Sequence, residues 1–564
     1  MKNTPATLHP SPFTRHSSPV TLHPSPFTRH LSPFTSLILL LLLTACSGPQ
    51  VPTHFTDSKT PPKIYPDYAE VTIPVNMAPL NFELLTGADD AVVRFSAAGQ
   101  ELVCGGLKAR PDIDEWKSLT AAAAGETVTV EVFAEQNGQW VRFKPFHIYV
   151  SRDSIDPWLS YRMISPSYVS YEELTINQRC LETFDEQVIV DNMLCSTEAG
   201  GQCVNCHNYQ QYNPGRMQFH ARQTHGGTVI VYDGQVEKVN MKNDSLLSAG
   251  VYPAWHPQQK LIAYSTNKTM QAFHTSDLNK IEVFDSESDL ILYDIDRHEV
   301  TPIESGPGEL EIYPCWSPDG RWLYFCSAHF EYQSGRPDLE EVTMRYQELK
   351  YNIYRKSFDP QTHHFGPREL VFAADSSLFT LHSSPVLTDS SPFTLHSSLS
   401  ATLPRISPDG RWLMFTLGEW GCFHIWHRDA DLWLLDLEGK ERIDSTAELS
   451  STHPSPFTLH QIPELNSDDT ESYHSWSSNG RWVVFSSRRY DSVFTRPFIA
   501  HIDADGHSSK PFELPARDPD YHRQLLKSYN VPELMRGPVT LSPQQMAAAL
   551  KQEGAAVTYS QQQK

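Results

Sequence analysis

The pentapeptide Cys203-Val204-Asn205-Cys206-His207 combines residue types and a spacing that can do chemistry. Cys-x-x-Cys-His is the attachment pattern of c-type haem. The thiols of Cys203 and Cys206 can each add to a vinyl group of haem, and His207 can then reach the iron as its proximal ligand. With 9 cysteines and 25 histidines in 564 residues, chance gives this pattern far less than once. The motif therefore predicts one covalently bound haem c.

The same residues could instead hold zinc or form a redox pair. A structural zinc ion takes four ligands, so the motif would need a fourth from Cys195, His220 or His225. A thioredoxin-like Cys-x-x-Cys lies between a strand and a helix, whereas the residues around this motif, Gly200-Gly201-Gln202 and Asn208-Tyr209-Gln210, predict a loop. We therefore favour haem over zinc, and zinc over redox thiols.

The iron of such a haem needs a sixth ligand or an open site. Met217 is the nearest methionine after His207, and the Pro214-Gly215 turn could bring it back toward the iron. A methionine–histidine pair raises the reduction potential and suits electron transfer. Met217 could instead fill a gap in the core, and His220 is then the alternative distal ligand.

A signal-peptide pattern lies near the start of the chain, and we assign 1–46 to an extension and a signal peptide, followed by a linker over 47–65. The apolar run 37–43 is too short to span a bilayer permanently, and basic residues precede it. The adjoining Leu43-Thr44-Ala45-Cys46 resembles a bacterial lipobox. The resemblance implies a lipid on Cys46 and a membrane-anchored protein of the cell envelope, facing the periplasm or the cell surface. An ordinary signal peptide with an incidental cysteine is the alternative.

Four internal repeats indicate the main fold. Each has an aromatic or apolar residue, a turn of the Ser-Pro-Asp-Gly type and an apolar strand, and they begin at Ala254, Cys315, Arg405 and Ser475. Proline suits the first corner of such a turn and glycine supplies the positive φ at its end, so each repeat predicts a tight hairpin. Repeats of this kind are typical of the blades of a β-propeller.

These repeats resemble those of TolB and of the propeller domains in prolyl oligopeptidase-like enzymes. The resemblance implies an all-β fold with a propeller of about six blades over 153–515, completed by earlier strands such as 159–164 and 228–232. The chain lacks the Gly-x-Ser-x-Gly motif of such hydrolases, which argues against a peptidase. Whether the protein is an enzyme stays open, and we favour an electron carrier over a catalytic haem. The order of lipobox, β-domain and haem motif also resembles a family of bacterial haem-and-propeller lipoproteins, which implies a haem-binding segment, 195–228, within the propeller.

The remaining segments complete the expected domain order. Strand-like residues in 66–152, separated by turn signals, predict a small immunoglobulin-like β-sandwich. Repeated Ser-Pro-Phe-Thr phrases predict low-complexity loops at 376–400 and 449–460. Residues 516–564 predict a C-terminal tail of short helices.

Composition limits the partners of the protein. A net charge of −22 argues against nucleic acid, whose binders carry a basic footprint. Two function classes stay open. The first is a lipid-anchored electron-transfer protein, in which one haem c on a propeller platform meets a redox or envelope protein partner. The second is a binding or scaffolding lipoprotein whose propeller recognises a protein or a glycan, with haem secondary or replaced by zinc.

Overall fold

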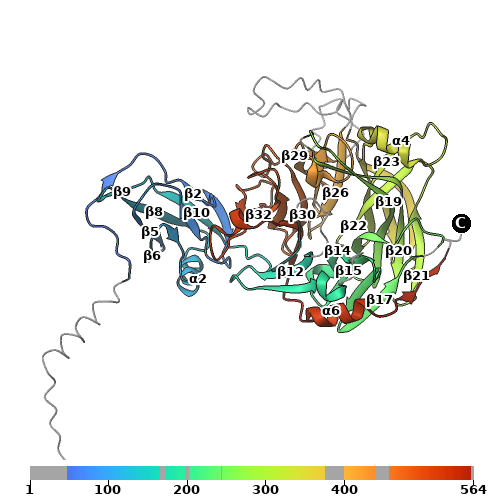
Figure 1. Ribbon diagram of the computed structural model, residues 1–564, viewed down its shortest axis with the longest axis horizontal. Helices are drawn as coiled ribbons and strands as arrows, with labels where there is room; N and C mark the ends of the chain where they lie inside the picture. Colours follow the sequence, from blue (N-terminus) through green and yellow to red (C-terminus); the bar gives the residue numbers. More distant parts are fainter. Residues whose placement is uncertain are drawn as a thin grey trace, which may run out of the picture. The chain divides into compact units, whose positions relative to one another are not determined.

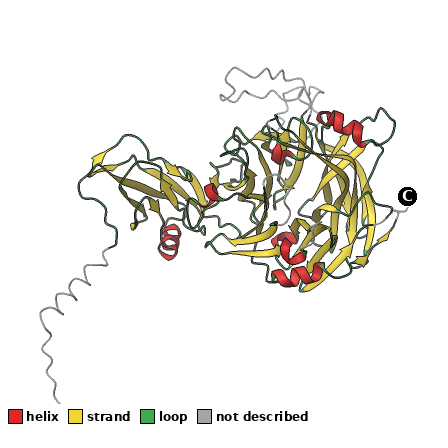
Figure 2. Ribbon diagram, in the orientation of Figure 1, coloured by secondary structure: helices red, strands yellow, loops and turns green. Residues whose placement is uncertain are grey.

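The computed structural model describes residues 48–165, 173–196, 202–242, 244–277, 279–374, 399–438 and 457–560. The predicted lipidation site at Cys46 and most of the predicted loops 376–400 and 449–460 lie outside these residues. Figure 2 shows a chain built mainly of strands with a few short helices. The all-β fold predicted from the sequence is confirmed.

A β-sandwich comes first in the described chain. Its larger sheet has the order β1-β9-β8-β10-β3, with β5 pairing to β8 and β6 to β5, and its smaller sheet has the order β2-β4-β7. Alternation along β8 turns Val128, Val130 and Val132 into the core. Its strands are β1 (Thr56–Asp57), β2 (Ile64–Tyr65), β3 (Val71–Pro74), β4 (Phe82–Leu84), β5 (Asp90–Ala97), β6 (Gln100–Gly105), β7 (Lys108–Ala109), β8 (Thr127–Gln136), β9 (Gln139–Arg142) and β10 (Phe146–Ser151).

The sandwich contains one helix that the sequence analysis did not predict. Helix α2 (Ile113–Ala122) begins after Asp112, whose side chain accepts hydrogen bonds from the backbone N–H groups of Asp114 and Glu115. It buries Trp116, whose indole N–H donates to the carbonyl of Met77 at 3.0 Å. The helix therefore closes one side of the sandwich core.

The described residues from Trp158 onward form six four-stranded blades arranged in a ring, and the colours of Figure 1 follow the chain around it. The innermost strands of successive blades pack on one another in turn. A single bridge between Ser288 and Leu310 joins the sheets of blades 3 and 4. The prediction of about six blades is confirmed.

The first three blades are made as follows. Blade 1 contains β11 (Trp158–Ile164), β12 (Thr175–Cys180), β13 (Glu186–Asp191) and β34 (Ser528–Met535). Blade 2 contains β14 (Gln202–Tyr209), β15 (Arg216–Gln223), β16 (Gly227–Tyr232) and β17 (Gln235–Asn240). Blade 3 contains β18 (Val251–Trp255), β19 (Leu261–Phe273), β20 (Ile281–Asp294) and β21 (Glu299–Glu304).

The other three blades come from one continuous stretch of sequence. Blade 4 contains β22 (Glu309–Trp316), β23 (Trp322–His329), β24 (Asn352–Asp359) and β25 (His364–Phe372). Blade 5 contains β26 (Ser400–Ile406), β27 (Trp412–Gly418), β28 (Asp431–Asp436) and β29 (Thr458–Gln461). Blade 6 contains β30 (Glu471–Trp476), β31 (Trp482–Ser487), β32 (Arg496–His501) and β33 (Phe512–Glu513).

The ring closes through a strand from the C-terminal segment. β34 pairs antiparallel with β11, so blade 1 joins three early strands to one late strand. The expected helical tail 516–564 thus contains the innermost strand of a blade, because β34 buries most of its residues in the ring. Two short helices flank it, α5 (Tyr521–Gln524) and α6 (Pro543–Leu550), and α6 packs beside β16 and β17 (Figure 1).

The remaining short elements are peripheral to the blades. β35 (Ala555–Ala556) and β36 (Thr558–Tyr559) extend blades 2 and 3 by pairing with β17 and β21. The other helices are α3 (Asn192–Cys195) and α4 (Leu339–Arg345), and 3-10 turns occupy Gln210–Tyr212, Tyr346–Glu348 and His424–Trp426.

The predicted hairpin turns are present in the repeats. In blade 4, the Ser317 hydroxyl accepts from the N–H of Trp322 at 3.0 Å, and the Asp319 carboxylate accepts from the N–H of Arg321 at 3.0 Å. Gly320 has φ +70°, which favours glycine. Equivalent turns with a glycine at positive φ occur in blades 5 and 6. These turns fix the register of each inner hairpin.

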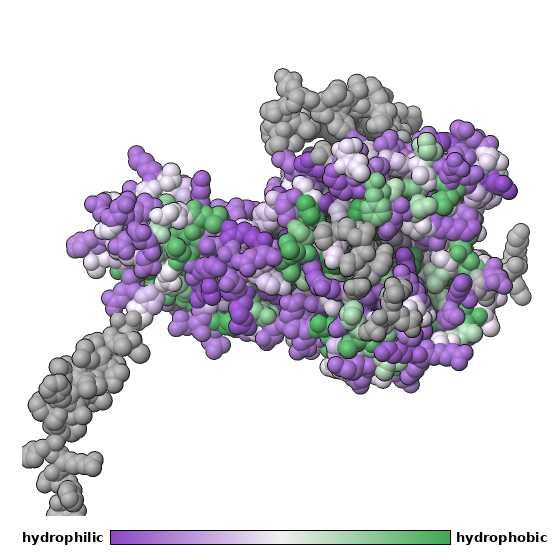
Figure 3. Space-filling model, in the orientation of Figure 1, coloured by the Kyte–Doolittle hydropathy of each residue, from purple (hydrophilic) through white to green (hydrophobic). Residues whose placement is uncertain are grey.

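Hydrophilic side chains cover most of the face shown in Figure 3, and the hydrophobic ones form separate small groups. Within the described residues, no helix is both long and apolar enough to cross a membrane.

Candidate functional site

Every inner strand of the propeller carries the same two-residue bulge. The pairing register shifts at this point in all six strands, and the first bulge residue has a positive φ between 46° and 56°. A bulge bends its strand and re-aims its side chains. The six bulges hold Cys206-His207, Tyr252-Pro253, Tyr313-Pro314, Leu403-Pro404, Tyr473-His474 and Val531-Pro532.

The Cys-x-x-Cys-His motif therefore lies in a strand, where the sequence analysis predicted a loop. β14 pairs with β15 on both sides of the bulge, Asn205 opposite His220 and Asn208 opposite Gln218. The polar residues around the motif are typical of an exposed loop. In the structure they face a cavity or partner strands instead of bulk solvent. The Gln218 amide also donates to the carbonyl of Cys206, which holds the bulge from the neighbouring strand.

A cavity of about 290 Å³, here called the first chamber, occupies the middle of the ring. The first bulge residue of every inner strand lines it. Cys203, Cys206 and His207 all line it as well, although Val204 between them is buried in the core. The three residues of the motif thus border one space, whose volume is at the lower end of the usual size of ligand pockets.

His207 is buried without a hydrogen-bond partner. The residue lines the first chamber and is 2% exposed, and neither ring nitrogen has a partner among the described residues. Burial, with a smaller contribution from the positive charge of Arg162, lowers the pKa of His207 to about 3. The imidazole is therefore neutral, the form that binds a metal.

A second, smaller cavity of about 150 Å³, the second chamber, follows along the ring axis on the other side of the bulges. Trp255, Trp316 and Trp476 line it, and the indole N–H of Trp316 donates to the carbonyl of Ala254 in the preceding blade at 3.1 Å. The two chambers share Asn208, Arg405 and Glu533 in their linings.

These shared residues form a polar partition between the chambers. The Asn208 amide donates to Glu533 at 2.9 Å, and Arg405 lies 3.4 Å from the same carboxylate oxygen. Burial raises the pKa of Glu533, while the charge of Arg405 lowers it. The partition separates a chamber rich in arginine and tyrosine from one lined by tryptophan.

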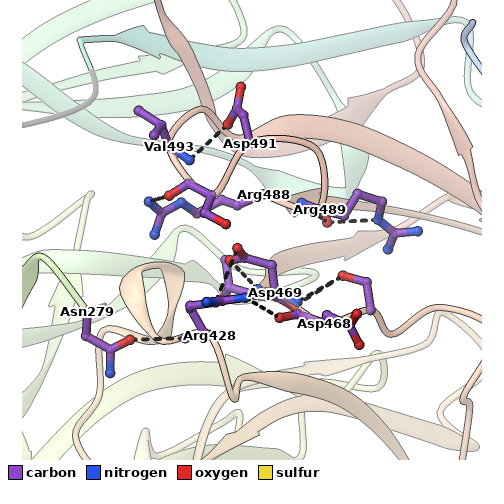
Figure 4. Close-up of polar contacts among 12 residues, drawn as sticks. Asn279, Arg428, Asp468, Asp469, Arg488, Arg489, Asp491 and Val493 are labelled. Atoms are coloured by element: carbon purple, nitrogen blue, oxygen red, sulfur yellow. Dashed lines mark hydrogen bonds and ion pairs between the residues drawn. The ribbon is translucent and has the colours of Figure 1, made fainter. Parts of the chain in front are cut away.

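A long hairpin closes one side of the first chamber. Thr269 and Gln271 of β19 and Val283 of β20 line the cavity. Figure 4 shows Arg428 between Asn279 at the hairpin tip and Asp469: its backbone N–H donates to Asn279 at 3.3 Å, and its guanidinium lies 3.6 Å from Asp469. These contacts connect the hairpin of blade 3 to the loops of blades 5 and 6.

The two distal ligand candidates lie beside the motif but outside the first chamber. Met217 is fully buried in the core cluster that contains Phe219 and Val204. The Nδ1 of His220 lies 3.0 Å from the hydroxyl of Thr228, and the ring borders a different pocket, between blades 2 and 3. Burial lowers the pKa of His220 to about 3. The structure brings neither side chain to the cavity that His207 lines.

The residues suggested for zinc are also apart. Cys195 is buried in α3 and its thiol donates to the carbonyl of Asp191 at 3.2 Å. In the described parts of the chain, no three side chains of His, Cys, Asp or Glu gather as metal ligands.

Sequence reasoning missed most of the cavity. Arg162, Arg222, Arg405 and Glu533 come from three different blades and share no spacing, so nothing in the sequence connected them. The bulge could have been found, because the pair before each repeat, as in Tyr252-Pro253, recurs along the chain.

Comparisons with known proteins found only solved structures of low sequence identity. No protein-family model and no curated protein matches the chain. TolB from Acinetobacter baumannii is 12% identical over 75% of this chain and 84% of its own, with a TM-score of 0.37. A DUF4784 family protein from Bacteroides caccae is 9% identical over 81% of this chain and 96% of its own, with a TM-score of 0.28.

Apo prolyl oligopeptidase B from Galerina marginata is 9% identical over 63% of this chain and 44% of its own, with a TM-score of 0.32. Such likenesses carry no argument about the site. The strand order itself establishes the propeller.

Proposed function

We propose that this protein is a lipid-anchored, extracytoplasmic c-type haem protein that transfers electrons and holds its haem at the centre of the propeller. The observation that supports the proposal is the convergence of Cys203, Cys206 and His207 on the first chamber. The motif rule demands two thiols and one imidazole, and the bulge of β14 presents all three to one cavity.

The residues of the chamber fit the proposed group. His207 offers a buried, neutral imidazole with two unpartnered nitrogens, one of which an iron would bond. Haem held there would supply a one-electron redox couple. Tyr252 and Tyr313, whose rings lie 4.7 Å apart, form part of the wall of the chamber.

A second candidate is a haem with an open distal side, which would bind or transform a small molecule. One observation favours it: among the described lining residues, His207 is the only histidine and no methionine is present. Spin state separates the two candidates. Electron transfer predicts a low-spin haem that resists carbon monoxide, and Met217→Ala should then change its spectrum. An open site predicts a high-spin haem that binds carbon monoxide and whose spectrum is unchanged by Met217→Ala.

Covalent attachment is tested by co-expression with a c-type haem maturation system. The wild type should keep its haem stain through denaturing electrophoresis, and Cys203→Ser and Cys206→Ser should each weaken it. Cys180→Ser, at another free and partly buried thiol, is the matched control and should change nothing. Complete loss of stain from the wild type, with stoichiometric zinc in its place, would contradict the proposal.

The anchor is a separate part of the proposal and rests on the sequence at Cys46. A labelled fatty acid should enter the wild type and not Cys46→Ala. Equal labelling of both proteins would contradict lipidation at this residue.

A further inference from the structure

The first chamber is cationic in a strongly acidic chain. The net charge of the protein is −22. Three arginines line the chamber, Arg162, Arg222 and Arg405, and Glu533 is the only carboxylate among the described lining residues. A cavity with an excess of one charge and a low-dielectric wall concentrates ions of the opposite charge. The chamber is therefore suited to an anionic occupant.

One arginine is already matched by a carboxylate. Arg405 lies 3.4 Å from Glu533, which also accepts from Asn208. This pair contributes little net charge to the chamber. The other two lining arginines, Arg222 and Arg162, are the candidates for binding an anion.

Arg222 is placed beside the first cysteine of the motif. It stands directly opposite Cys203 across β14 and β15, and directly opposed residues project from the same face of a sheet. Within the described residues Arg222 forms no ion pair. Asp285, whose charge interacts with that of Arg222, is already hydrogen-bonded by Asn267 at 2.7 Å and Thr269 at 2.6 Å.

Arg162 approaches the chamber from blade 1. It is paired with Asn530 across β11 and β34, and its guanidinium donates to the neutral amide of Asn530 at 2.9 Å. Asn530 thus orients the guanidinium toward the chamber that both residues line. Guanidinium groups bind carboxylates through two parallel hydrogen bonds, which gives strength and a fixed orientation.

We propose that Arg222, together with Arg162, binds the carboxylates of the molecule attached at Cys203 and Cys206, and that these carboxylates are the propionates of haem. The inference rests on the proposed function for the identity of the occupant. The two arginines then fix the orientation of the ring, while the thiols and His207 fix its position.

The test uses reversible binding, so that it does not depend on covalent attachment. The full-length variant Cys203→Ser/Cys206→Ser, produced without haem, is titrated with haemin and with haemin dimethyl ester, whose propionates carry no charge. In this background, Arg222→Gln and Arg162→Gln should each weaken haemin binding roughly tenfold. Neither should change the affinity for the ester by more than about twofold, and Arg222→Lys should recover part of the loss.

A matched control and the contrary results complete the test. Arg297→Gln removes an arginine on the turn after β20, whose side chain is 67% exposed, and should leave both affinities unchanged. Equal losses for haemin and its ester, unchanged haemin affinity in Arg222→Gln, or no haemin binding at all would overturn the inference. If the wild type carries no covalent haem but the arginine effect appears with haemin alone, the proposed attachment fails and the carboxylate site stands.

Discussion

Strands β14 and β30 place a histidine at the same point of the same bulge, but the protein makes a hydrogen bond to only one of them. His474 in β30 is 2% exposed, and its Nε2 donates to the carbonyl of Met414 at 3.0 Å. His207 in β14 is also 2% exposed, and neither nitrogen has a partner among the described residues. Burial lowers the pKa of both to about 3.

The difference between the two histidines separates what the propeller fold requires at this bulge from what the candidate site adds. Four of the six bulges carry proline at the second position, Pro253, Pro314, Pro404 and Pro532. The backbone there needs no N–H donor, so the propeller does not require a histidine. One nitrogen of His474 makes a hydrogen bond and its Nδ1 has no partner among the described residues, whereas both nitrogens of His207 lack one. The additional unsatisfied nitrogen of His207 costs about 1–3 kcal/mol unless a ligand satisfies it.

The largest expected effect comes from giving β14 the bulge of its neighbours. The double substitution Cys206→Tyr/His207→Pro reproduces the Tyr-Pro pairs of blades 3 and 4. We expect a folded propeller, judged by circular dichroism and a cooperative melt, that retains no haem after denaturing electrophoresis. A variant that fails to fold would show that β14 needs the cysteine and the histidine for its structure. That result would contradict the statement that the propeller does not require His207.

The reciprocal change at β30 should affect stability alone. His474→Pro removes the hydrogen bond to Met414 and fits a backbone that accepts proline in four other blades. We expect a loss of about 1–3 kcal/mol in the free energy of unfolding, measured in urea, with haem content equal to that of the wild type. Loss of haem from this variant would show that the two histidines are not functionally distinct.

The smallest effect is a pH dependence at β30. The folded pKa of His474 is lowered from 6.5 to about 3, so the unfolded chain binds the proton first as the pH falls. Stability is therefore lost below pH 6.5, by about 1 kcal/mol between pH 6.5 and 5.5 for this one group. His474→Gln removes the group that takes up this proton. The free energy of unfolding of the variant, relative to that of the wild type, should therefore rise as the pH falls from 6.5 to 5.5. A constant difference between the two proteins would contradict a neutral, buried His474.

The sequence predicted the propeller and the chemical groups of the site, but not their arrangement. Turns such as Ser317-Pro318-Asp319-Gly320 are local, so their geometry follows from a few adjacent residues. The closing strand β34 was mistaken for part of a helical tail because its partner, β11, is more than three hundred residues away in the chain. Glu533 could not be connected to the motif, since only the closed ring brings β34 to the same cavity. Arg222 depends on the pairing of β14 with β15, which was missed because the motif was predicted to lie in a loop.

The central claim is that the bulge of β14 holds a covalent haem, and peptide mass spectrometry tests it most directly. The mature protein, made with a c-type haem maturation system, is digested, and the peptide that contains Cys203, Cys206 and His207 is fragmented. The account predicts one haem on this peptide, joined through thioether bonds to both cysteines and absent from the peptides of the other cysteines. Recovery of the peptide without haem, with both thiols free to react with an alkylating reagent, would contradict it.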